Sequence, residues 1–339
     1  MRKITIVLCS LYVCFLTLFA PVTATPGYAG DVVSWKFFIS YPPSLFPILP
    51  QFPDMVKKET NGKLDVKMYF FGEHPYKGSE IMKALRDDKC QLGEIEGIYC
   101  AGYEPVLALT GTPMVAGSYD QMIAMHEALM KEGLLQKVYD RYNIFEAAYW
   151  VWFGPAISCK DTLINDMNSL KGKKIRVPSR QHAEVVKWLG GSPVTISWGE
   201  VYSALQRGVI DGAIGSLAGQ KNSKWYEVCK YTTRMAEAFG MDRICVNKEA
   251  FGKLDKDVQD GLIRAIKQYE TMKRNQMRGD DALATVEIMH KNGVTVRAMP
   301  AGVMDEIVKK AKPFMAEWAQ ESGKGAPEAN QVLMQVLGW

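Results

Sequence analysis

Hydrophobic positions along the chain follow two periods, one typical of strands and one typical of helices. Segments with the two periods alternate along the sequence. Residues 35–40 are apolar and strand-like, and residues 64–70 alternate cleanly between apolar and polar side chains. Residues 46–60, 78–87 and 118–132 have helical spacing instead. Strands that alternate with helices in this way predict a parallel sheet covered by helices.

A second series of the same kind begins after the aromatic run Tyr149–Phe153, which ends at Gly154-Pro155. We expect the chain to cross there from one domain to another. Strands are predicted over 174–177, 193–196 and 209–214, and helices over 182–189 and 199–207. About 310 residues would remain after loss of a leader, more than one core usually organises, which also favours two domains.

The segment Asp255–Lys291 keeps helical spacing without interruption. At about 1.5 Å per residue, such a helix spans roughly 50 Å and extends beyond a single small domain. We expect it to lie across both domains as a brace. Asn292-Gly293 ends it, and a strand over 294–298 and helices near 304–320 and 331–337 are predicted to follow.

The N-terminus has the pattern of a Sec-type signal peptide. Arg2 and Lys3 precede an apolar run from Ile4 to Ala20, and small residues follow as far as Ala29. The run is about 17 residues long, short for a membrane span of about 20. We expect cleavage after Ala29 or Ala24 and a soluble chain in the periplasm.

Charge and cysteine usage exclude several classes of function. Loss of Arg2 and Lys3 with the leader lowers the formal charge from +4 to +2, so nothing predicts nucleic-acid binding. Cys9 and Cys14 lie in the leader, and the other five cysteines match no metal motif. They are expected to be buried thiols, with one bridge possible and at least one thiol free.

Familiar signatures of nucleotide, zinc-peptidase and hydrolase chemistry are absent from the sequence, and no metal or cofactor is expected. The four histidines are scattered along the sequence, and we expect them to be surface or capping residues. Only His74, in a turn after a strand, is placed where a cleft could form.

The strand Lys174–Val177 carries the first candidate for binding chemistry. Alternation sends Ile175 and Val177 to one face and Arg176 to the other, at the carboxyl end of a parallel strand where open α/β sheets bind ligands. The planar guanidinium suits a carboxylate. On the pattern alone, an edge arginine paired with a neighbouring acid is an equal alternative.

Two further features point to the same crevice. Ser197 and Glu200 are spaced as a capping box, which places Trp198 on the first turn of a helix, and helix N-termini favour anions. Trp198 is therefore placed to cover a ligand, although a packing role is as common. Gly215 and Ser216 end the next predicted strand, at the same edge.

The chain resembles a known family in two segments, Leu170–Ser179 (LKGKKIRVPS) and Glu200–Gly212 (EVYSALQRGVIDG). They are similar to the substrate-binding subunits of tripartite ATP-independent periplasmic (TRAP) transporters, the DctP-type proteins. The likeness extends from Trp35 to about Ala319. It implies a class II-like periplasmic-binding-protein fold, with two α/β lobes joined by crossing strands, a long brace helix over both, and closure around one ligand.

The lobes expected from this resemblance follow the predicted crossover. Residues 1–29 are the signal peptide, 30–153 with 242–281 form lobe I, and 154–241 with 282–339 form lobe II.

The resemblance also implies roles for single residues. The carboxylate-binding arginine of the family falls on Arg176, with Ser179 in the same loop, and the aromatic cover falls on Trp198. An acid that contacts the ligand in sialic-acid-binding relatives falls on Glu96, which could accept from an amine or hydroxyl or could cap a turn. The candidate ligand-binding residues are Arg176, Trp198, Glu96, Ser216, Gly215, Trp152, Ser179 and, more weakly, Glu73.

Departures from the sialic-acid-binding relatives concern the rest of the ligand. Their second arginine falls on Ala156, and an asparagine falls on Gly215 or Ser216. With Trp152 and Trp198 nearby, a monocarboxylate with an apolar or ring-bearing body is expected.

The expected function is capture of a small organic carboxylate by a monomeric protein and its delivery to a membrane permease driven by an ion gradient. Two alternatives remain open at this stage. One is a receptor that presents ligand to a sensor kinase. The other is an enzyme on the same scaffold, although no nucleophile or acid/base pair is evident in the expected cleft.

Overall fold

Five strands form the first sheet, in the order β2-β1-β3-β10-β4. In the computed structural model, which describes residues 32–339 except 44–48, 113–115, 236–237 and 280–281, these residues form one unit. The first three strands pair in parallel, and β10 runs antiparallel to both of its neighbours. The strands are β1 (Val33–Phe38), β2 (Leu64–Tyr69), β3 (Leu92–Glu96), β4 (Ile144–Phe153) and β10 (Ala238–Asn247). The predicted signal peptide lies outside the described residues.

Six strands form the second sheet, in the order β11-β9-β5-β8-β6-β7. The pairs β6–β7, β6–β8 and β9–β11 are parallel, whereas β5 is antiparallel to β8 and β9. The strands are β5 (Pro155–Cys159), β6 (Lys174–Val177), β7 (Ser192–Thr195), β8 (Gly212–Ser216), β9 (Tyr231–Arg234) and β11 (Thr295–Ala298).

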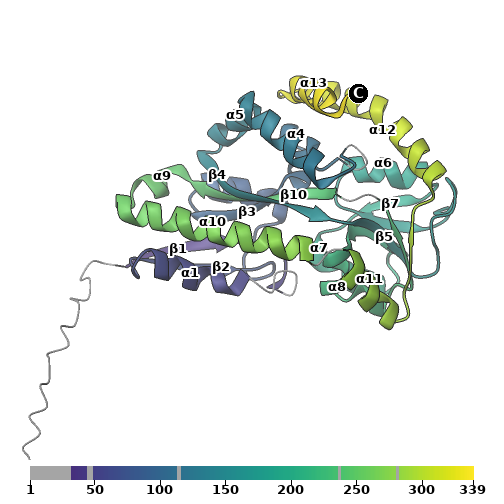
Figure 1. The fold of residues 1–339 in the computed structure, drawn as a ribbon, viewed down its shortest axis with the longest axis horizontal. Coiled ribbons are helices and arrows are strands. Elements are labelled where there is room, and N and C mark those ends of the chain that lie inside the picture. The colour runs from purple at the N-terminus through teal and green to yellow at the C-terminus, as the bar shows by residue number, and fades with distance from the viewer. Residues whose placement is uncertain (1–31, 44–48, 113–115, 236–237, 280–281) are drawn as a thin grey trace, which may run out of the picture. The chain divides into compact units, whose positions relative to one another are not determined.

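The chain passes between the sheets on extended strands, as Figure 1 shows. On the outward path β4 continues into β5 with only Gly154 between them, and Gly154 has the left-handed φ of +60° that glycine adopts at little cost. On the return path β9 precedes β10. The two-lobed α/β fold with crossing strands is thus confirmed.

Helices cover both sheets (Figure 1). The segments before β10 are η2 (Leu49–Gln51), α1 (Phe52–Glu59), η3 (Gly78–Glu80), α2 (Ile81–Arg86), η4 (Gly97–Cys100), α3 (Pro105–Leu109), α4 (Tyr119–Lys131), α5 (Leu134–Arg141), α6 (Arg180–Trp188), α7 (Trp198–Gln206), α8 (Leu217–Asn222) and η5 (Trp225–Glu227). After β10, α9 (Lys248–Gly252) leads into the long helical segment.

The predicted brace over 255–291 is described as two helices, α10 (Lys256–Gly279) and α11 (Ala282–Lys291), on either side of residues 280–281. Leu262, Ile266 and Tyr269 are fully buried, as the apolar stripe of α10 requires. This helix packs on β4 and α1, whereas α11 packs on α8 and β11. The segment therefore contacts elements of both sheets.

The last two helices, α12 (Ala301–Ser322) and α13 (Ala326–Leu337), close the chain. Trp188 of α6 meets Phe314 of α12 edge to face at 5.9 Å, so α12 contacts a helix of the second sheet. In contrast, α13 packs on α4 and α3, which belong to the segment expected in lobe I. The exact division of the C-terminal residues between lobes remains a prediction.

All five cysteines beyond the leader are buried free thiols. Burial raises the pKa of the Cys100 thiol to about 12 and that of Cys229 to about 12. These thiols therefore behave as small apolar side chains at neutral pH. The bridge that the sequence left possible is not formed.

Candidate ligand-binding site

Arg176 of β6 is fully buried, and its guanidinium is held by two backbone carbonyls. Nε donates to the Ile196 oxygen at 2.8 Å, and Nη1 donates to the Ile214 oxygen at 2.9 Å. Nη2 is buried without a hydrogen-bond partner among the described residues. Both anchors are neutral carbonyls rather than an acid, so the positive charge is fixed in place but not neutralised. Such a group favours an anionic partner.

Trp198 forms a wall beside this guanidinium. Its ring centroid lies 5.5 Å from the Arg176 Cζ, and the indole stacks on Trp225 with centroids 4.8 Å apart. The indole Nε1 donates to the Ser223 hydroxyl at 3.1 Å. Trp198 is therefore both packed and placed next to the candidate anion site. The hydroxyl of Ser197 makes no capping hydrogen bond, so the expected capping box is not formed.

Gly215 provides room for the Trp198 ring. A Cβ atom at Gly215 would lie 2.7 Å from one ring carbon of Trp198, and one at Gly219 would lie 2.9 Å from the same ring system. Both distances are shorter than side chains tolerate. Gly215 therefore acts on the site through the position of Trp198, and the direct ligand contact expected from the sequence stays a prediction.

We predict that Gly215→Ala lowers the free energy of unfolding by about 1–3 kcal/mol, because the added methyl group must displace Trp198 and Trp225 within a packed core. Urea denaturation followed by circular dichroism measures this. Gly252→Ala is the matched control, since nothing lies within 4 Å of a Cβ at that position. Equal stability of the two variants would contradict the packing role of Gly215.

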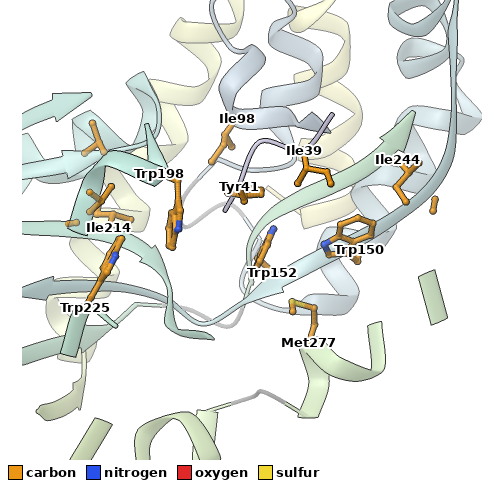
Figure 2. Packing of buried hydrophobic residues seen from close by; sticks show 14 of the residues in the cluster. Ile39, Tyr41, Ile98, Trp150, Trp152, Trp198, Ile214, Trp225, Ile244 and Met277 are labelled. Carbon is orange, nitrogen blue, oxygen red and sulfur yellow. The ribbon is translucent and has the colours of Figure 1, made fainter. Parts of the chain in front are cut away.

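Aromatic side chains from both sheets enclose a small cavity at Arg176. Figure 2 shows Tyr41 close to Trp198 and Trp152, and its ring centroid lies 6.2 Å from that of Trp198 and 6.0 Å from that of Trp152. The cavity has a volume of about 10 Å³, which is about enough for one water molecule. Its lining residues are Tyr41, Ile98, Tyr99, Trp152, Arg176, Pro178, Trp198 and Ser216.

Trp152 is held from behind by a buried acid. Its Nε1 donates to the Asp242 Oδ2 at 2.6 Å, and Asp242 of β10 lies opposite Glu96 of β3 in the sheet register. The buried Lys273 of α10 lies 5.3 Å from the Trp152 ring centroid. The wall opposite Arg176 is therefore fixed by a polar cluster that comprises Glu96 of β3, Asp242 of β10 and Lys273 of α10.

Burial, and then the neighbouring Asp242 carboxylate, raise the pKa values of Glu94 and Glu96 well above their ordinary range. Burial also raises the pKa of Asp242, but hydrogen bonds from Glu96 and Trp152 oppose this rise. Asp242 is thus the acceptor of the cluster, and the two glutamic acids stay protonated and donate.

Glu96 contributes stability that is complete below the ordinary carboxyl pKa of about 4.3 and is lost as pH rises toward its raised folded-state pKa. We predict that Glu96→Gln, which cannot ionise, gains stability relative to the parent chain as pH rises from about 4 to neutral. Urea denaturation across this range measures the difference. Glu73→Gln is the control, because Glu73 is exposed. If the difference in unfolding free energy between Glu96→Gln and the parent chain did not change with pH, Glu96 would not have the raised pKa described.

Glu96 also caps the turn that follows its strand. Its Oε1 accepts from the Ile98 amide at 3.4 Å, and the residue is not among those that line the cavity. Of the two roles left open by the sequence, this geometry matches the capping role. Glu73 is exposed and its Oε2 accepts from the Phe70 amide at 2.9 Å, so it also holds a turn.

The two candidate serines both follow Arg176 in the sequence, Ser179 just before α6 and Ser216 at the end of β8. Ser216 lines the cavity, and its hydroxyl accepts from the Gly219 amide at 3.2 Å. Ser179 is buried, with its hydroxyl 2.9 Å from the His182 Nδ1. Burial, and then Arg176, lower the pKa of His182 to about 3. His182 therefore stays neutral and adds no second positive charge.

His74 lies outside the cavity. Its ring stacks on Phe38 with centroids 4.6 Å apart, and its Nε2 lies 3.0 Å from the Ile39 oxygen. The residue is thus part of the first-sheet core.

Sequence reasoning missed Tyr41, Tyr99 and Asp242. Tyr41 and Tyr99 follow the carboxyl ends of β1 and β3, the same position that singled out Arg176, so the rule applied to the second sheet could have found them in the first. Burial raises the pKa of both hydroxyl groups, while Arg176 opposes this for Tyr99. Both phenols therefore remain neutral hydrogen-bond donors near the site.

A sequence profile of one protein family matches most of the chain. The family is described as bacterial extracellular solute-binding protein, family 7, and it matches residues 47–321. The C4-dicarboxylate-binding periplasmic protein DctP of Rhodobacter capsulatus is 26% identical over 278 residues, which cover 79% of this chain and 81% of that protein. The sialic acid-binding periplasmic protein SiaP of Vibrio cholerae is 25% identical over 185 residues, 54% of this chain and only 57% of SiaP.

Solved structures show the same fold. The extracytoplasmic solute receptor DctP6 of Bordetella pertussis, solved as a receptor binding pyroglutamic acid, has a TM-score of 0.81 and 25% identity, covering 90% of this chain and 99% of that one. A TRAP periplasmic solute-binding protein of Rhodoferax ferrireducens with bound malonate has a TM-score of 0.78 at 20% identity, covering 89% and 98%. No helix among the described residues is long and apolar enough to cross a membrane. The chain therefore belongs to the DctP-type family of bacterial extracellular solute-binding proteins, the substrate-binding proteins of TRAP transporters.

Proposed function

We propose that this protein captures a small organic monocarboxylate between its two sheets through a salt bridge to Arg176, and delivers it to the permease subunits of a TRAP transporter. The observation that carries the proposal is the buried guanidinium of Arg176, whose Nη2 has no hydrogen-bond partner among the described residues and whose side chain lines a cavity. A buried and uncompensated cation is costly, and a bound carboxylate would offset that cost.

The walls of the cavity support an apolar or ring-shaped body for the ligand. Tyr41, Trp152 and Trp198 present aromatic surfaces to the cavity. Ala156, on which the resemblance places the second arginine of sialic-acid-binding relatives, is buried and supplies no second cation. One carboxylate is therefore matched by one cation, and the rest of the ligand would contact rings.

Ligand entry requires the two sheets to separate. A cavity of about 10 Å³ is too small for an organic acid, so a ligand that reaches Arg176 needs the side chains around the cavity to move apart. Larger open cavities adjoin it on two sides, and Tyr99 and Pro178 line all three. Binding would thus involve opening and renewed closure, driven by the affinity of the ligand for the closed state.

Localisation and partners follow from the same proposal. Residues 1–29 would direct export to the periplasm, where the mature monomer meets its ligand. Delivery would use permease subunits driven by an ion gradient.

A thermal-shift screen tests the ligand class. Pyroglutamate is the first compound to try, because DctP6 of Bordetella pertussis, solved with pyroglutamic acid, is similar over most of this chain. Each acid is compared with its uncharged amide at equal concentration. The proposal expects at least one monocarboxylate, and not its amide, to raise the melting temperature. Stabilisation by amides alone would contradict it.

A further inference from the structure

We propose that Phe71, which lies outside the cavity at Arg176, is a positioning residue whose ring seats on Gly199 and holds the closed conformation in which Trp198 covers Arg176. The inference rests on the proposed function, because it concerns how the site closes over its ligand. Gly199 is the residue that the Phe71 ring contacts, and a side chain at this position would prevent the two sheets from closing over the site.

The contact between the two residues is close. A Cβ atom at Gly199 would lie 2.3 Å from the Phe71 Cε1 and 2.4 Å from its Cδ1. The backbone of Gly199 does not have the left-handed φ that requires glycine, since it is absent from the positive-φ glycines of the described chain. The lack of a side chain at this position is therefore explained by the Phe71 ring and not by backbone geometry.

Phe71 is presented by a turn that is firmly attached to the first sheet. Its amide donates to the Tyr41 oxygen at 3.1 Å, directly after β1. The carboxylate of Glu73 accepts from the Phe70 amide within the same turn, and a β-bridge joins Phe71 to the buried His74. The ring thus moves with the first sheet when the sheets separate.

Gly199, in contrast, belongs to the second-sheet side. It is in the first turn of α7, next to Trp198, and α7 follows β7 of the second sheet. The first turn of α7 therefore meets the first-sheet side twice: Trp198 contacts Tyr41 inside the site, and Gly199 contacts Phe71 beside it. Phe71 and Trp198 both line the larger open cavity of about 520 Å³ at the mouth. A contact at the mouth can thus set how firmly the inner site closes.

Pulsed electron paramagnetic resonance on the ligand-free chain tests the inference. Spin labels replace Lys57 of α1 and Lys187 of α6, which are exposed residues on the first-sheet and second-sheet sides, while the five described cysteines are buried. In the parent chain we expect a population at the short distance of the closed conformation. Gly199→Ala should deplete it and shift the distribution to longer distances, because the methyl group meets the Phe71 ring.

A double-mutant cycle identifies the contact responsible. Phe71→Ala should also deplete the short-distance population, and Gly199→Ala should add no further shift once the Phe71 ring is gone. Gly302→Ala, with no neighbour within 4 Å, is the control and should leave the distribution unchanged. Gly199→Ala should not lower the melting temperature, because alanine is favoured over glycine in a helix.

Distributions that are unchanged by both single substitutions would overturn the inference, and so would additive shifts in the double variant. Because the distances are measured without ligand, they remain informative even if no carboxylate binds. Failure of the proposed function would instead appear as absence of binding to the parent chain.

Discussion

Replacing Arg176 by methionine is expected to abolish stabilisation by any monocarboxylate that stabilises the parent chain. The side chain is fully buried, and its Nη2 has no hydrogen-bond partner in the part of the chain that the structure describes. Without it, a bound carboxylate would be buried with no opposite charge, which costs about 3–5 kcal/mol. The dissociation constant measured by titration calorimetry should therefore rise by at least about a hundredfold.

The same substitution should raise the melting temperature of the ligand-free protein. Methionine removes a buried charge that has no acidic partner among its hydrogen bonds and fills a similar volume. Loss of ligand response together with a gain in stability separates a binding role from unfolding. Arg180→Met is the control, since that side chain is 58% exposed and pairs with Glu321. If Arg176→Met still binds the acid with unchanged affinity, the anchor assignment is wrong.

The largest loss of stability is expected for Glu146→Gln. Burial alone would raise the pKa of Glu146, but the contacts with His126 at 2.9 Å and Arg243 at 3.2 Å outweigh burial and hold this pKa below its ordinary value. The Tyr139 hydroxyl also donates to it at 2.5 Å. Removing the charge leaves Arg243 buried and unpaired, so unfolding should become easier by about 3 kcal/mol or more.

The pH dependence of this effect has the opposite sign to that of Glu96. A lowered folded-state pKa means that the contribution of Glu146 is present above its ordinary pKa and is lost as pH falls through the lowered value. Urea denaturation at neutral and acidic pH should therefore show the destabilisation by Glu146→Gln shrinking in acid. If Glu146→Gln destabilised the protein equally at both pH values, the charge of Glu146 would not be the cause of its stabilising effect.

Most of the architecture was predictable because strand and helix periods are local properties of the sequence. The rule that ligands bind at the carboxyl ends of parallel strands singles out Arg176 as a candidate ligand-binding residue from the sequence alone. The family pattern in Leu170–Ser179 pointed to the same residue. Burial of the arginine without an acid could not be predicted, because it depends on the carbonyls of Ile196, which follows β7, and of Ile214 in β8.

Several further features could not be predicted, because contacts between distant segments leave no local pattern in the sequence. The length of the ten-residue β10 could not be predicted, because its pairing with β3 and β4 sets its bounds. The packing of the Trp198 ring against Gly215 could not be predicted, while the ligand contact expected of Gly215 stays a prediction. Asp242 could not be identified either, since only the fold brings it to Trp152.

A crystal structure of the protein with the best monocarboxylate from the thermal-shift screen tests the central claim most directly. We predict that one carboxylate oxygen lies about 2.8 Å from the Arg176 Nη2, the usual length of a charge-assisted hydrogen bond, with the body of the ligand between Trp152 and Trp198. A ligand whose carboxylate lies away from Arg176, or that binds outside the space between the two sheets, would contradict the account.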